Sequence, residues 1–163
     1  MANQQDVIIK MVLDAWTTHV NSADKLFSAL TDEQLQQQVS PNRNRGIYLL
    51  GHLTSVHDRM LPLLDFGDQR YPELNDVFLR KPDKSALEVP PTNDLRRYWK
   101  EVNEILGQHC MRLQPPGWFE KHTAVSEDDF KKEPHRNKLN VILNRTNHLA
   151  SHLGQLLFLK NSD

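Results

Sequence analysis

The chain of 163 residues contains a single cysteine, Cys110. One cysteine excludes an internal disulfide, and it excludes a zinc site built from thiolates, because such a site needs at least two cysteines. Any metal ion would therefore be held by histidine and carboxylate side chains. No motif surrounds Cys110, so we interpret it as a small buried side chain and not as a nucleophile.

Long apolar runs and an excess of one charge are also missing. No stretch approaches the roughly 18 apolar residues that span a bilayer, and the start MANQQDVIIK lacks the features of a secretory leader. The 20 Lys and Arg residues balance 21 Asp and Glu residues, so no basic field marks the chain for nucleic acid. We expect a cytoplasmic protein that binds neither membranes nor nucleic acid.

The apolar residues follow a helical pattern. No segment shows the alternation of a strand, and no internal repeat or low-complexity tract is evident. Apolar side chains instead recur every three or four positions in four long segments. These segments cover about 4–30, 45–64, 92–113 and 137–159. The pattern predicts a single all-α domain over residues 1–163, folded as an antiparallel four-helix bundle.

Local signals indicate where the helices begin. Thr31 and Gln34 form a capping-box pattern that opens a short helical piece after the first long segment. Asn44 is the predicted N-cap of the second long helix, and Thr92 or Asn93 is that of the third.

Two connections, residues 65–91 and 114–136, are too long for simple turns. Connections of this length are usually functional covers or partner surfaces. Both carry large apolar side chains, which we expect to pack back onto the helices; the alternatives are that they wall a pocket or bury a dimer contact. They are Phe66, Tyr71, Phe78, Leu79, Trp118, Phe119 and Phe130.

Three histidines form a candidate metal site. His148 and His152 stand four residues apart in the last helical segment, a spacing that places Cβ atoms about 5 to 6 Å apart on one helix face. His52 occupies the inward stripe of the second long segment. Three imidazoles can share one divalent ion and leave a coordination position open, which is typical of catalytic and not of structural zinc sites.

Two stretches resemble a known family. RNRGIYLLGHLTSVHDRM, followed about ninety residues later by RNKLNVILNRTNHLASHLGQLLFL, is similar to the DinB-like superfamily, which includes the YfiT-type metal-dependent hydrolases. The specific motifs are Gly51-His52-Leu53 on the second long helix and His148 through Gln155 on the fourth. The family fold is a four-helix bundle, and the likeness covers nearly the whole chain in helix order.

The resemblance implies that His52, His148 and His152 bind a divalent ion, zinc or nickel. It also implies a homodimer and a metal-dependent reaction on a small molecule, either S-transfer with a low-molecular-weight thiol or hydrolysis. We rank these two reactions closely, because no general base is evident, and we assign no catalytic residue. One alternative is a non-catalytic bundle whose histidines satisfy one another and which functions through binding or dimerisation. A third is a bundle that retains the metal ion and acts as a sensor.

The other histidines receive structural interpretations. His19 and His109 lie on core-facing stripes and are predicted to be hydrogen-bonded interior side chains, with His19 as the reserve ligand. His57 is rotated about 140° from His52 around the helix and is predicted to be peripheral. The two histidines near the last connection, His122 and His135, are predicted to be solvated.

Three neighbours of the histidine pair are also interpreted. Arg145 falls one turn before His148 on the inward face, where an unpaired guanidinium is costly. We expect it to form an ion pair with a carboxylate, and the alternative is an anionic group of the substrate. Gly154 is predicted to allow close helix approach, and Gln155 either to orient a ligand or to cap the core.

Overall fold

The computed structural model describes residues 3–85 and 87–161, and these residues confirm an all-α protein. Four long helices are α1 (Gln4–Ala29), α3 (Gly46–Asp58), α5 (Thr92–Arg112) and α8 (Lys138–Leu156). The short helices are α2 (Asp32–Leu35), α4 (Met60–Leu63), α6 (Pro115–Trp118) and α7 (Glu127–Lys132), with a π-helical turn at Asp76–Arg80 and a 3-10 turn at Leu157–Asn161. No helix in the described ranges is long and apolar enough to cross a bilayer.

Several helix ends follow the expected local chemistry. The Thr31 hydroxyl accepts from the Gln34 amide while the Gln34 side chain accepts from the Thr31 amide, so the predicted capping box is confirmed. At the start of α8 the Asn137 side chain accepts from the amide of Asn140. These contacts satisfy backbone N–H groups that have no partner inside the helix.

Other helix ends differ from expectation. Arg45, not Asn44, is the N-cap of α3, because its amide donates to the distant Asp83 carboxylate at 2.8 Å. The predicted helix 45–64 is interrupted after Asp58, since Pro62 has no N–H to donate to the Asp58 carbonyl. The N-cap of α5 is Pro91, so the expectation of Thr92 or Asn93 is wrong by one or two residues.

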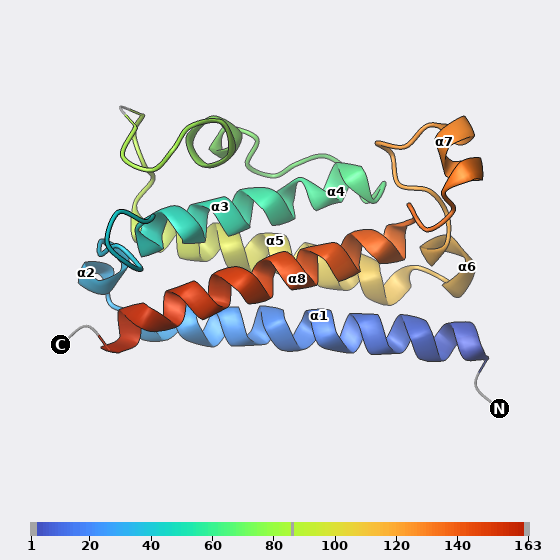
Figure 1. Ribbon diagram of the computed structural model, residues 1–163, viewed down its shortest axis with the longest axis horizontal. Coiled ribbons are helices and arrows are strands. Elements are labelled where there is room, and N and C mark those ends of the chain that lie inside the picture. Colours follow the sequence, from blue (N-terminus) through green and yellow to red (C-terminus); the bar gives the residue numbers. More distant parts are fainter. Residues whose placement is uncertain (1–2, 86, 162–163) are drawn as a thin grey trace.

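The long helices pack in parallel and antiparallel pairs (Figure 1). Helices α1 and α8 run the same way, with His19 and Ala150 at one end of a shared cavity and Leu26 and Leu157 at the other. Helices α3 and α5 are also parallel, whereas α1 against α5 and α3 against α8 are antiparallel.

The expectation of a uniformly antiparallel arrangement is therefore wrong for two of the pairs. The physical reason is the path of residues 64–85, which run back along the outside of α3 (Figure 1). The chain thus returns to the end of the helix array at which α3 began, and α5 must run in the same direction as α3.

His57 lies in the core and is not peripheral as predicted. Its ring is fully buried between Trp16 and Trp99, with centroid distances of 4.7 and 4.8 Å. Its Nδ1 donates to the Asn103 side chain at 2.8 Å. The rotation away from His52 does not expose His57, because α3 is covered by α5 on one side and by the following connection on another.

This burial predicts a pH dependence of stability. Burial, the largest cause, lowers the pKa of His57 to about 3, whereas a histidine in the unfolded chain titrates near about 6.5. The unfolded state therefore binds more protons between these values, and the free energy of unfolding should fall as the pH is lowered from about 6.5 toward 3. Above about pH 6.5 this contribution is fully present.

Urea unfolding of wild type and His57→Phe at several pH values, in the presence of a chelator, measures this effect. The variant should lose part of the pH dependence because it has no proton to bind at this position. Parallel stability curves for the two proteins would contradict the assignment.

Candidate metal centre

Helices α3 and α8 bring the three predicted histidines together. His52 comes from α3, and His148 and His152 lie one turn apart on the antiparallel α8. The Nε2 atom of His148 is 3.3 Å from Nε2 of His52 and 3.1 Å from Nε2 of His152. The three side chains are half-buried, and one nitrogen from each lies within 4.8 Å of the others.

The outer ring nitrogens fix the protonation of two of these imidazoles. His52 Nδ1 donates to the carbonyl of Phe78 at 2.9 Å, and His152 Nδ1 donates to Oε1 of Gln155 at 2.8 Å. A neutral imidazole that carries its proton on Nδ1 has a bare lone pair on Nε2. Two lone pairs therefore converge on His148, whose Nε2 can donate to only one of them.

The spacing of these nitrogens suits a tetrahedral ion. Zn–N bonds of about 2.0 to 2.1 Å at tetrahedral angles place neighbouring nitrogens about 3.3 to 3.4 Å apart, and the two short separations are 3.3 and 3.1 Å. The Nδ1 of His148 is buried and has no partner among the described residues. The donor set therefore fits one divalent ion with at least one open position.

The surroundings of His52 and His148 disfavour the protonated, charged form of both imidazoles. Burial is the largest cause that lowers the pKa of His52, and it lowers that of His148 to about 4. The neighbouring imidazoles and Arg145 lower the pKa of both groups further. Near pH 7 both imidazoles are therefore neutral. A metal ion that binds them does not have to displace the proton of a charged imidazolium.

The first long connection helps to place His52, a role that was not predicted from the sequence. Phe78, in the π-helical turn, provides the carbonyl that accepts from His52, and its buried ring lies over Gly51. A Cβ added at Gly51 would come within 2.3 Å of that ring. The available signals were the glycine directly before His52 and the aromatic side chains of the connection.

Tyr48 secures the same turn. Its hydroxyl donates to the carbonyl of Lys81 at 2.8 Å and lies 3.3 Å from that of Phe78. Three residues after the turn, Asp83 forms a bidentate ion pair with Arg45. The connection is thus fastened to α3 at Phe78, which orients His52, and at two positions that follow it.

A cavity of about 310 Å³ adjoins the histidine cluster. Its apolar walls come from α3, α4 and the first connection, while the polar groups are two imidazoles and two guanidiniums. The lining residues are His52, Val56, Arg59, Leu63, Leu79, Arg145 and His148. Leu79 therefore walls a pocket, one of the roles weighed for the apolar residues of this connection.

Arg145 does not form the expected ion pair. No carboxylate lies within salt-bridge distance of it in the described ranges, and its buried Nε has no hydrogen-bond partner there. The one acidic residue of α3, Asp58, instead accepts from the backbone amides of Arg70 and Tyr71. Burial and the charge of Arg59 lower the pKa of Arg145.

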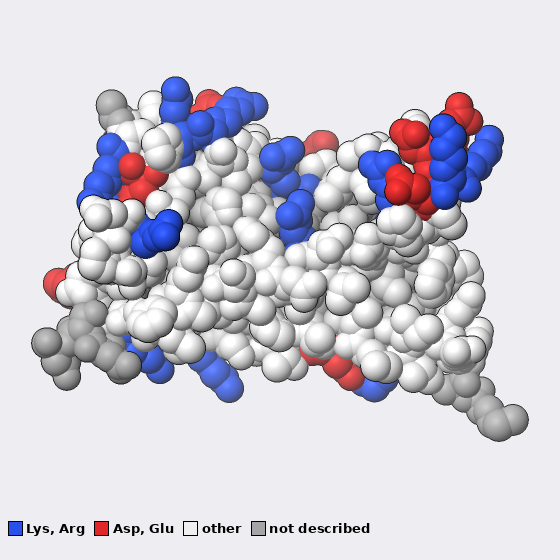
Figure 2. Space-filling model, viewed as in Figure 1, with Lys and Arg blue, Asp and Glu red and all other residues white. Residues whose placement is uncertain are grey.

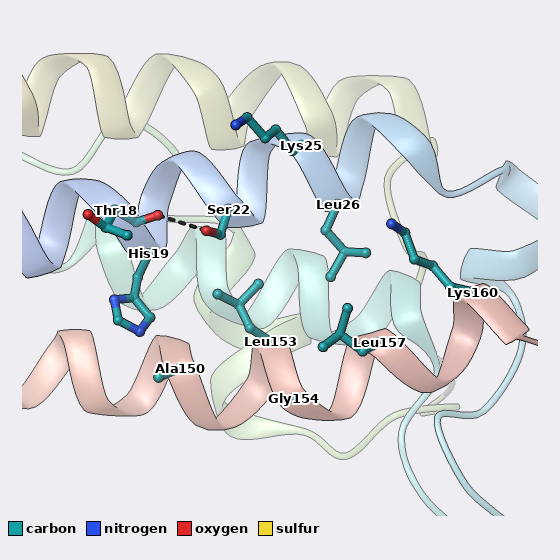
Figure 3. A pocket seen from close by; sticks show the side chains of 10 residues that line it. All are labelled: Thr18, His19, Ser22, Lys25, Leu26, Ala150, Leu153, Gly154, Leu157 and Lys160. Atoms are coloured by element: carbon teal, nitrogen blue, oxygen red, sulfur yellow. Dashed lines mark hydrogen bonds between the residues drawn. The ribbon is translucent and has the colours of Figure 1, made fainter.

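His19, the reserve ligand, faces a different cavity. This cavity of about 510 Å³ lies between α1 and α8, where His19 points toward Ala150 (Figure 3). His19 Nδ1 donates to the Ala15 carbonyl at 2.8 Å, as expected of a hydrogen-bonded histidine. Gly154 also lines this cavity, and a Cβ there would meet nothing within 4 Å, so the predicted close approach at Gly154 is wrong.

The remaining histidines lie away from the cluster. His109 stacks on Phe66 with ring centroids 4.9 Å apart. His135 is exposed as predicted. The His122 side chain is half-buried, and its Nδ1 atom is fully buried. The prediction that His122 is solvated is therefore wrong for Nδ1.

The hydrogen bond from His152 predicts an effect of Gln155 on metal affinity. Gln155→Ala should weaken Zn²⁺ binding by about 10-fold to 100-fold, since His152 would lose the acceptor that orients its ring. Gln155 is exposed, so the fold should be retained. Competition titration with a chromophoric chelator measures the change. Gln108→Ala, at an exposed position of α5, is the matched control, and equal affinities of the two variants would contradict this role.

No protein-family model matches the chain, and a search of the curated proteins finds no match. The geometry of the histidines, their hydrogen bonds and the adjoining cavity therefore carry the functional interpretation.

Proposed function

We propose that this chain is a DinB-like four-helix bundle of YfiT type. The support is the set of four long helices, α1, α3, α5 and α8, with two long connections after α3 and α5. The motifs around His52 and His148 supply the family resemblance. The homodimer, the cytoplasmic location and the absence of nucleic-acid and membrane partners stay predictions.

We further propose that His52, His148 and His152 hold one divalent ion, zinc or nickel. The observation that carries this proposal is the pair of Nε2 lone pairs directed at His148, with both outer nitrogens already committed to acceptors. Converging lone pairs repel one another, and a cation between them removes the repulsion. When bound, the ion would act as a Lewis acid that lowers the pKa of a water or thiol beside it.

The cavity lining favours a thiol over water as the nucleophile. No carboxylate lines the cavity, and its two histidines are the proposed ligands, so among the described residues no separate base is present to take a proton. A thiol ionises near about pH 8.5 without help, whereas bulk water ionises far above that. We therefore propose a thiol-dependent S-transferase, with hydrolysis as the second reaction.

In the proposed reaction the thiol loses its proton to bulk water. The thiolate sulfur then forms a bond to an electrophilic carbon, and the bond from that carbon to the leaving group breaks. The leaving group departs with the electron pair. The chain itself holds the reactants against the apolar walls formed by Val56, Leu63 and Leu79.

A turnover screen tests this proposal. Metal-loaded protein is assayed with low-molecular-weight thiols and alkylating electrophiles, and separately with esters and amides. We expect thiol-dependent turnover that disappears after chelation and in His152→Ala. Silence in all assays of a protein shown to carry its ion would contradict the enzymatic proposal and favour a binding or sensor protein.

A further inference from the structure

Two guanidiniums face the cavity beside the histidines without an acidic partner. Arg59 lies at the junction of α3 and α4, and Arg145 lies on α8 one turn before His148. Both line the 310 Å³ cavity, to which no carboxylate contributes. Figure 2 shows basic side chains gathered in the hollow over the α3 and α8 region.

Five other arginines have acidic partners, whereas the exposed Arg43, Arg70 and Arg112 form no ion pair in the described ranges. Arg45 is bidentate with Asp83, and Arg96 pairs with Asp32. Arg145 and Arg59 form no such pair within residues 3–85 and 87–161. The buried Nε of Arg145 also lacks any hydrogen-bond acceptor in these ranges. A buried N–H donor without an acceptor costs free energy, so an acceptor supplied by a ligand would stabilise the site.

The two positive charges indicate that such a ligand would carry a negative charge. Arg59 and Arg145 line the same cavity, so their positive charges repel one another, and besides burial the charge of Arg59 lowers the pKa of Arg145. An anion between them would convert this repulsion into two attractions. The planar fork of a guanidinium matches carboxylate and phosphate oxygens, which can accept two parallel hydrogen bonds.

The two arginines lie in the same cavity as two histidines of the proposed metal site. His52 and His148 line the same cavity as the two arginines, and Val56, Leu63 and Leu79 provide apolar walls. A volume of about 310 Å³ is at the lower end for ligand sites. One small molecule can therefore place an oxyanion on the arginines and a reacting group at the histidines, with a short hydrocarbon segment against the walls.

We propose that Arg59 and Arg145 form an oxyanion subsite that binds the carboxylate or phosphate group of a small anionic substrate. The role in substrate selection rests on the proposed function of the three histidines. Anion binding itself rests only on the two arginines, so the two proposals can fail separately.

Binding of inorganic phosphate to chelator-treated, metal-free protein tests the subsite. Isothermal titration calorimetry at low ionic strength should show saturable binding to the wild type. Arg145→Gln and Arg59→Gln should each weaken it by at least about 10-fold, because each removes a charged hydrogen-bond donor. Arg145→Lys should bind with intermediate affinity, since it keeps the charge but loses the fork.

Arg97→Gln is the matched control. Arg97 is exposed on α5 and already paired with Asp94 and Glu101, so this variant should bind phosphate as the wild type does. Circular dichroism of each variant establishes that it is folded. A wild type that binds neither phosphate nor propionate, or equal phosphate affinity in the folded Arg145→Gln, Arg59→Gln and Arg97→Gln variants, would overturn the subsite.

A second titration, with propionate, separates a carboxylate source from a phosphate source. Tighter binding of propionate indicates a carboxylic acid substrate, and tighter binding of phosphate indicates a phosphorylated one. Metal loading of the same preparation is measured in parallel. Phosphate binding without metal binding would contradict the proposed function alone, and metal binding without binding of either anion would contradict the subsite alone.

Discussion

Replacing His148 with alanine should lower the affinity for Zn²⁺ or Ni²⁺ by more than about 100-fold, beyond the 10-fold to 100-fold loss typical of changes outside the ligand set. His148 is the central member of the cluster, because its Nε2 is within 3.3 Å of the Nε2 atoms of both other histidines. Without it, His52 and His152 would be left as a pair of ligands from two different helices.

Competition titration with a chromophoric chelator measures this loss in protein purified without an affinity tag. His19→Ala is the control, since His19 is also a half-buried histidine on a long helix but faces the cavity between α1 and α8. The control should keep the wild-type affinity. Equal affinities of wild type and His148→Ala would show that the cluster is not the metal site.

Gly51→Ala should destabilise the fold by about 1 to 3 kcal/mol, the range for overpacking of a core, and should also weaken metal binding. The new methyl group would come within 2.3 Å of the Phe78 ring, so that ring would have to move. The carbonyl that accepts from His52 belongs to the same residue and would move with it. One methyl group would thus disturb both the packing and the orientation of a ligand.

Urea unfolding and chelator competition measure the two effects of this variant. Gly107→Ala on α5 is the matched control, because a Cβ there meets nothing within 4 Å. The control should be neutral or stabilised by up to about 1 kcal/mol, since alanine favours a helix over glycine. A Gly51→Ala protein that behaves like Gly107→Ala would contradict the proposed contact.

Features encoded by local sequence could be predicted well. The periodicity of α1 and α8 and the capping box at Thr31 depend on residues a few positions apart. The meeting of His52 with His148 and His152 was also predictable, because each lies on the inward stripe of its own helix. Periodicity alone did not single them out, since His19 and His109 also lie on core-facing stripes; the spacing of His148 and His152 and the motif around His52 did.

Features that depend on distant contacts could not be predicted. The N-cap of α3 is determined by Asp83, which is 38 residues away in the chain. The burial of His57 between Trp16 and Trp99 requires knowing that α3 is covered on several sides. The parallel direction of α3 and α5 depends on the path of residues 64–85, which carry no periodic pattern.

The surroundings of the histidines were the least predictable part. Phe78 lies in an irregular turn, so nothing in its local sequence shows that its carbonyl faces His52. The expected partner of Arg145 was a carboxylate, but Asp58 accepts from backbone amides of the connection instead. Both facts follow from the fold of the first long connection.

X-ray absorption spectroscopy of the Zn²⁺-loaded protein tests the central claim most directly, because it reports the atoms around the ion. We expect three imidazole nitrogens at about 2.0 to 2.1 Å together with one further light atom from solvent, and one imidazole fewer in His52→Ala. An ion with fewer than three imidazoles in the wild type, or with the same number in His52→Ala, would contradict a site formed by His52, His148 and His152.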